Sequence, residues 1–157
     1  HFVDRSGQHS QAELAAIEQL ARGLRDDEGA IIFPEGTRFS RARRQRVIER
    51  LAERDGELAS YAKSLAHLLA PRAGGSLALM RGAPEARVVF LAHHGLEGSR
   101  GWAQLLSGEL VGRELSIRMW TAPRPGSEDG VEAWLRSHWS DMDAWIETQA
   151  TRPPPSS

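Results

Sequence analysis

The chain has 157 residues, of which 40% are hydrophobic and 26% are charged, and this composition fits one globular domain with a buried core. The net charge of −1 supplies no general basic field, which argues against nucleic acid as a partner. The absence of cysteine excludes disulfides, thiolate metal sites and a cysteine nucleophile, and no apolar run is long enough to span a membrane.

The N-terminal part of the chain predicts an extended piece, a helix and a strand. Residues 2–5 are extended, and residues 10–13 form a capping box for a helix whose apolar stripe reaches Leu24. Residues 29–33 are short and apolar, as in a buried strand of a parallel sheet. The expected fold is therefore α/β, with layered helices on a mostly parallel or mixed sheet. We expect one domain over residues 1–149 and a disordered tail over residues 150–157.

The hexapeptide FPEGTR at positions 33–38 begins at the last residue of the predicted strand and is the most informative stretch of the chain. Arg38 offers a planar fork of donors that matches phosphate oxygens, and Gly36 permits a sharp turn and a close approach by a ligand. Thr37 adds a hydroxyl, while Glu35 can pair with Arg38 or accept hydrogen bonds from a polyol. The residues therefore favour a phosphate site at a strand end, although a Pro-Gly turn with a surface arginine is the alternative.

A helix over residues 40–54 is expected next, and this region is rich in arginine. Residues 38–54 contain Arg38, Arg41, Arg43, Arg44, Arg46, Arg50 and Arg54. These side chains suit a basic patch for phospholipid headgroups or a coenzyme A phosphate, with Arg41, Arg43 and Arg44 nearest the hexapeptide. The alternative is a solvated helix face whose charge is balanced by neighbouring acids.

The remaining pattern predicts a helix over residues 57–69, a helix beginning within residues 76–80, strands over 87–92 and 114–120, and a final helix opening at Ser127. His93 and His94 are adjacent and lack partners at ligand spacing, so we expect no metal site. His138 and Asp143 have H-x4-D spacing inside the final helix. Residues five apart lie about 140° apart around a helix, so this pair is expected to occupy ordinary helix positions.

The hexapeptide also resembles the third signature block of the glycerolipid acyltransferases. Residues 2–5 match the F-[IV]-x-R half of the second block of that family, which adds Arg5 as a phosphate contact. The segment Pro71-Arg72-Ala73-Gly74-Gly75 resembles a P-R-[TS]-x-G element of the lysocardiolipin and lysophosphatidylinositol acyltransferase branch, with Ala73 in place of the hydroxyl residue. This second element adds Arg72 as a candidate contact.

The resemblance implies transfer of a fatty acyl group from a thioester to the hydroxyl of a lysophospholipid or acylglycerol phosphate. Arg5, Glu35, Gly36, Thr37, Arg38 and Arg72 would then hold the acceptor. The catalytic H-x4-D block of the family would lie before His1, so we expect an N-terminally truncated fragment without catalytic residues. No cofactor or metal is implied, and acyl-CoA or acyl carrier protein would be the co-substrate. A membrane-associated protein on the cytoplasmic face is expected.

A second function stays open at this stage. The same arginines would serve a non-catalytic α/β module that binds phospholipid or nucleotide phosphates, because phosphate binding needs no general base.

Overall fold

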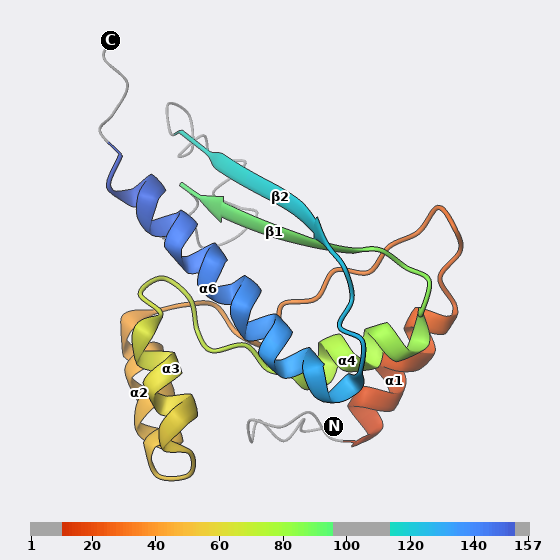
Figure 1. Ribbon diagram of the computed structural model, residues 1–157, viewed down its shortest axis with the longest axis horizontal. Helices are drawn as coiled ribbons and strands as arrows, with labels where there is room; N and C mark the ends of the chain where they lie inside the picture. The colour runs from red at the N-terminus through yellow and green to blue at the C-terminus, as the bar shows by residue number, and fades with distance from the viewer. Residues whose placement is uncertain (1–10, 96–113, 153–157) are drawn as a thin grey trace, which may run out of the picture.

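The computed structural model describes residues 11–95 and 114–152, and it combines helices with a small two-stranded sheet (Figure 1). The helices are α1 (Gln11–Arg22), α2 (Arg41–Ala52), α3 (Gly56–Ser64), α4 (Ala73–Gly82) and α6 (Val131–Ala150), with a 3-10 turn η1 (Glu128–Gly130) before α6. The strands are β1 (Val88–His94) and β2 (Ser116–Ala122). Residues 1–10 and 153–157, with the predicted extended piece, the capping Ser10 and most of the predicted tail, lie outside the described residues.

The two strands form an antiparallel ribbon that lies against α6 (Figure 1). Phe90 of β1 stands opposite Trp120 of β2, and their rings lie 5.5 Å apart on the face that meets α6. This face belongs to the core cluster, whose buried members are Leu65, Phe90, Ala92, Ala122, Leu135, Trp139, Met142 and Ile146. Apolar side chains on both strands and on one stripe of α6 explain why these elements pack together.

The prediction of a mostly parallel or mixed sheet was wrong for the part of the chain that the structure describes. Its one strand pair is antiparallel, and residues 29–33 form no strand. Ile31 is 87% exposed and Phe33 is 77% exposed, so this segment is not a buried strand either. A parallel strand needs a neighbouring strand to accept and donate its backbone hydrogen bonds, and none of the described residues provides one here.

Four of the five helices in the described residues pack as two pairs. Helices α2 and α3 form a hairpin that projects away from α6 in Figure 1, and α1 packs on α4. Ser40, the first residue of the predicted helix, caps α2 by accepting from the N–H of Arg43. At the other pair, a Cβ on Gly82 would lie 2.3 Å from the carbonyl oxygen of Glu18, so glycine permits the close approach of α1 and α4.

Candidate phosphate-binding site

The hexapeptide forms a tight turn that is fixed to the rest of the protein. The N–H of Gly36 donates to the carbonyl of Phe33 at 2.9 Å, which closes the turn around Pro34 and Glu35. Pro34 is buried, and its fixed φ suits the first central position of such a turn. Gly36 has a φ of +67°, a conformation that glycine adopts without the steric cost of a side chain.

Arg72 joins this turn from a distant part of the sequence. Its N–H donates to the carbonyl of Pro34 at 3.0 Å. Its guanidinium lies against Gly36, because a Cβ built there would be 3.3 Å from Cζ and from both terminal nitrogens of Arg72. The two sequence elements that were predicted to bind phosphate, residues 33–38 and residues 71–75, are therefore in direct contact.

The charge of Arg72 has no acidic partner among the residues that the structure describes. Partial burial lowers the pKa of this guanidinium, and the positive charge of Arg50 on α2 lowers it further. Arg72 also precedes α4 immediately, and that helix begins without a side-chain cap. The positive end of the helix and a half-buried arginine thus meet at one side of the turn.

Glu35 also contacts the segment that precedes α4. Its carboxylate accepts a hydrogen bond from the N–H of Leu69 at 3.2 Å and forms no ion pair with Arg38. Burial raises the pKa of Glu35 to about 7; the bond from Leu69 opposes this rise, and the charge of Asp143 adds to it. The carboxylate therefore fixes the segment between α3 and α4, whereas Thr37 and Arg38 stand exposed on the turn. Arg5 lies outside the described residues.

Two of the arginines near the hexapeptide, Arg43 and Arg44, form hydrogen bonds to the backbone of neighbouring segments. Arg44 donates to the carbonyl oxygens of Leu65 at 2.6 Å and Lys63 at 2.7 Å, so it secures the end of α3. Arg43 donates to the carbonyl of Arg38 at 2.8 Å and so links α2 to the end of the turn. None of the arginines between positions 38 and 54 forms an ion pair within the described ranges. With seven arginines against Glu49 and Glu53, residues 38–54 therefore carry a net positive charge.

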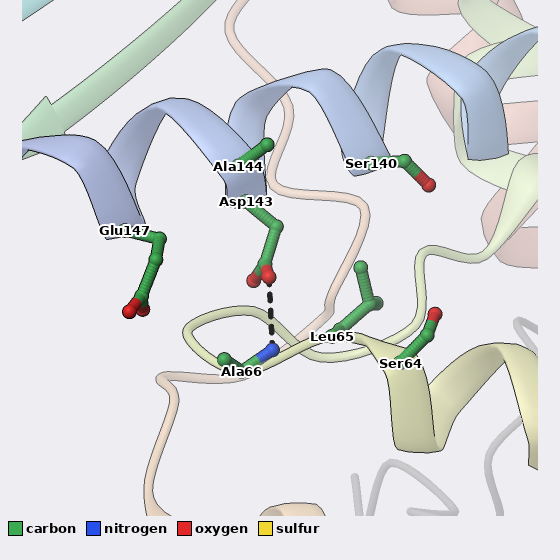
Figure 2. Close-up of a pocket in the computed structure, with 7 residues that line it drawn as sticks. All are labelled: Ser64, Leu65, Ala66, Ser140, Asp143, Ala144 and Glu147. Carbon is green, nitrogen blue, oxygen red and sulfur yellow. Dashed lines mark hydrogen bonds between the residues drawn. The ribbon is translucent and has the colours of Figure 1, made fainter.

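The pair His138 and Asp143 has two separate structural roles. The buried carboxylate of Asp143 accepts from the N–H groups of Ala66, His67 and Leu68 at 2.8–3.0 Å (Figure 2 shows the bond to Ala66). His138 packs instead on Phe90, with ring centroids 4.4 Å apart. The two side chains therefore contact different parts of the protein, as expected for residues about 140° apart around the helix.

These bonds also explain why α3 ends at Ser64 and does not continue to residue 69 as predicted. The N–H groups of residues 66–69 point to Asp143 and Glu35, so they are not available to a helix. One sequence signal could have revealed this arrangement. Asp143 falls on the apolar stripe of the final helix, four residues after Trp139, and a carboxylate on such a stripe must find donors inside the protein.

An open pocket of about 380 Å³ lies beside Asp143, between α6 and the end of α3 (Figure 2). It is lined by Ser64, Leu65, Ala66, Ser140, Asp143, Ala144 and Glu147. Both hydroxyl groups donate to backbone carbonyls, and the lining carries two carboxylates and no cation. The pocket therefore suits a phosphate poorly, and none of the hexapeptide residues lines it.

Across residues 11–95 and 114–152 there is no group of three or more side chains placed to hold a metal ion. The same residues contain no helix with the length and apolar character needed to cross a bilayer. Comparisons of the chain with protein-family models, with curated proteins and with solved structures found no match.

Proposed function

We propose that this chain is the acceptor-binding part of a glycerolipid acyltransferase. The observation that carries the proposal is the contact of Arg72 with the turn at Pro34 and Gly36, because it unites the two elements on which the resemblance depends. The site offers a guanidinium without an acidic partner in the described residues, an uncapped helix start and exposed Thr37 and Arg38. These groups suit the phosphate of a lysophospholipid or acylglycerol phosphate.

In the proposed reaction, the acceptor hydroxyl attacks the carbonyl carbon of an acyl thioester. A carbon–oxygen bond forms, the carbon–sulfur bond breaks, and the thiol of coenzyme A or acyl carrier protein leaves with the proton. The turn and Arg72 hold the acceptor phosphate, which fixes the distance of the hydroxyl from the donor. No residue of the described ranges is assigned as the general base. We propose that the protein acts at a membrane surface, where a lysophospholipid acceptor resides, on its cytoplasmic face.

A direct test uses the natural polypeptide that contains this chain, supplied with a lysophospholipid in vesicles and an acyl-CoA. We expect ester formation by mass spectrometry, and Arg72→Gln should raise the KM for the acceptor about tenfold or more, because a charge-assisted contact contributes roughly 1.5–3 kcal/mol. Arg72→Lys should recover only part of this loss, since lysine lacks the planar fork. Unchanged acceptor kinetics in Arg72→Gln would show that the site is misplaced.

A non-catalytic phosphate-binding module is the second candidate, and one observation favours it. All the groups around Arg72 can hold an anion without any base or nucleophile. Binding of phospholipid by the natural polypeptide, without any acyl transfer from acyl-CoA or acyl carrier protein, would support the module and contradict the enzyme.

A further inference from the structure

The segment between α3 and α4 is fastened to α6 by hydrogen bonds to two side chains. Asp143 accepts from the N–H groups of residues 66–68, and Figure 2 shows one of these bonds. Trp139 lies one turn earlier on α6, and its Nε1–H donates to the carbonyl of Leu69 at 3.1 Å. Residues four apart share one face of a helix, so a single face of α6 holds these successive residues of the segment.

Leu69 also joins this segment to the hexapeptide turn. Its N–H donates to the carboxylate of Glu35 at 3.2 Å, while its carbonyl accepts from Trp139. Leu69 is 3% exposed and Trp139 is 7% exposed, so the bond between them is buried. A buried carbonyl is costly to leave unpaired, and removal of the indole N–H therefore favours a shift of the backbone at Leu69.

Arg72 follows Leu69 by three residues and is tied to the same turn. Its N–H donates to the carbonyl of Pro34 at 3.0 Å, next to Glu35 in the sequence. Pro71 stands between the two bridges, and its ring fixes φ and also restricts the residue before it. A stiff connector therefore links the backbone of Leu69 to that of Arg72, so a displacement of Leu69 is transmitted to the arginine.

We propose that Trp139 is a positioning residue for Arg72 and acts from α6 through Leu69. The inference rests on the proposed phosphate site and deepens it, because it adds a residue that controls the site without touching the ligand. The guanidinium of Arg72 packs on Gly36, where a Cβ would lie 3.3 Å away. A guanidinium that is held in place before the anion arrives loses less conformational freedom on binding, so a secure Leu69 raises the affinity for phosphate.

The test measures binding of glycerol phosphate to the 157-residue chain by NMR titration. Trp139→Phe keeps an aromatic ring in the core and removes the donor to Leu69. Trp134→Phe is the matched control, because the Nε1–H of Trp134 also donates to a backbone carbonyl, that of Pro123, in the segment between β2 and η1. We expect Trp139→Phe to weaken binding about two- to tenfold and Trp134→Phe to leave it close to wild type.

Two further measurements separate positioning from a general loss of stability. In Arg72→Gln, Trp139→Phe should cause no further loss of binding, because the side chain through which Trp139 acts is gone. Amide hydrogen exchange gives a readout without ligand. The N–H of Arg72 should exchange faster in Trp139→Phe than in Trp134→Phe, relative to the amides inside α1.

Wild type supplies a readout that needs no variant and decides the role if Trp139→Phe does not fold. Titration with glycerol phosphate should shift the indole N–H signal of Trp139, because binding at Arg72 is transmitted to Leu69 and then to its donor. The indole N–H signal of Trp134 should stay in place. Equal shifts of the two signals, or no shift of the Trp139 signal on binding, would overturn the positioning role.

The outcomes separate this role from the phosphate site itself. Weaker binding in Arg72→Gln with no change in Trp139→Phe would overturn the positioning role and leave the phosphate site standing. Equal losses from Trp139→Phe in the wild-type and Arg72→Gln backgrounds, or equal losses in Trp139→Phe and Trp134→Phe, would also overturn the role, as would unchanged exchange of the Arg72 N–H. No binding by wild type would overturn the phosphate site and this role with it.

Discussion

The guanidinium of Arg72 lies against the α-carbon of Gly36, in tight contact with the position that the Cβ of any other residue would occupy. Three atoms of the guanidinium group stand 3.3 Å from that position. The backbone N–H of Arg72 is bonded at the same time to Pro34, so both the main chain and the side chain of Arg72 are tied to the turn. Because Gly36 has no Cβ, the guanidinium of Arg72 can pack against the turn. Gly36 therefore helps to position this arginine, whether or not a ligand also approaches the glycine.

Replacement of Gly36 by alanine should disturb both the fold and the site. The φ of +67° is unfavourable for alanine, and the new methyl group would push the guanidinium of Arg72 away. We expect a loss of about 1–2 kcal/mol in the free energy of unfolding and a weaker affinity for glycerol phosphate. Urea denaturation and ligand titration measure the two effects. Gly126→Ala is the control, because a Cβ there meets no atom within 4 Å and its φ is not positive.

Asp143 should be essential for stability rather than for chemistry. Asp143→Asn replaces a carboxylate oxygen by an NH2 group, which would then face a backbone N–H of residues 66–68. We expect a loss of roughly 3 kcal/mol in the free energy of unfolding, because a buried donor would lose its acceptor. Asp141→Asn changes the same charge at an exposed position of α6 and should leave stability close to that of wild type. A stable Asp143→Asn protein would contradict this role.

A substitution of Arg44 tests whether this arginine stabilises the fold or binds the phosphate. Its guanidinium donates to two carbonyls at the end of α3, where it is bound to the fold. Arg44→Met keeps an apolar stem and removes both bonds, so we expect a loss of about 1–3 kcal/mol in stability and an unchanged affinity for glycerol phosphate. Thermal denaturation and titration of one preparation measure both. A weaker phosphate affinity at full stability would place Arg44 in the binding site instead.

Local signals predicted the helices and the two strands of the ribbon, but they did not predict the antiparallel sheet or the exposed segment at residues 29–33. Ser40 marked the start of α2 because a cap acts within one turn of its own helix. The apolar run at residues 29–33 gave no such local information. A short apolar run becomes a buried strand only if other strands flank it, and here Ile31 stays exposed. The contact between Arg72 and Gly36 likewise depends on the tertiary fold, although both residues were selected from their motifs.

Glu35 should make the stability of the protein depend on pH. Its pKa is raised from 4.5 to about 7, so folding favours its protonated form. The stabilisation is fully present below about pH 4.5 and is lost as the pH rises through about 7. Glu35→Gln keeps an acceptor for the N–H of Leu69 and has no charge to bury. We therefore expect it to match wild type near pH 4.5 and to be more stable at about pH 8, by at most about 3 kcal/mol.

Chemical denaturation of wild type and Glu35→Gln across this pH range measures the free energy of unfolding of each protein. Groups that titrate alike in the two proteins cancel when one free energy is subtracted from the other. Glu85→Gln is the matched control, since Glu85 is exposed and has no hydrogen bond within the described ranges. The difference from wild type should vary with pH more for Glu35→Gln than for this control. If the two differences varied alike, or if wild type were the more stable protein at about pH 8, Glu35 would not be a buried carboxyl group that resists ionisation.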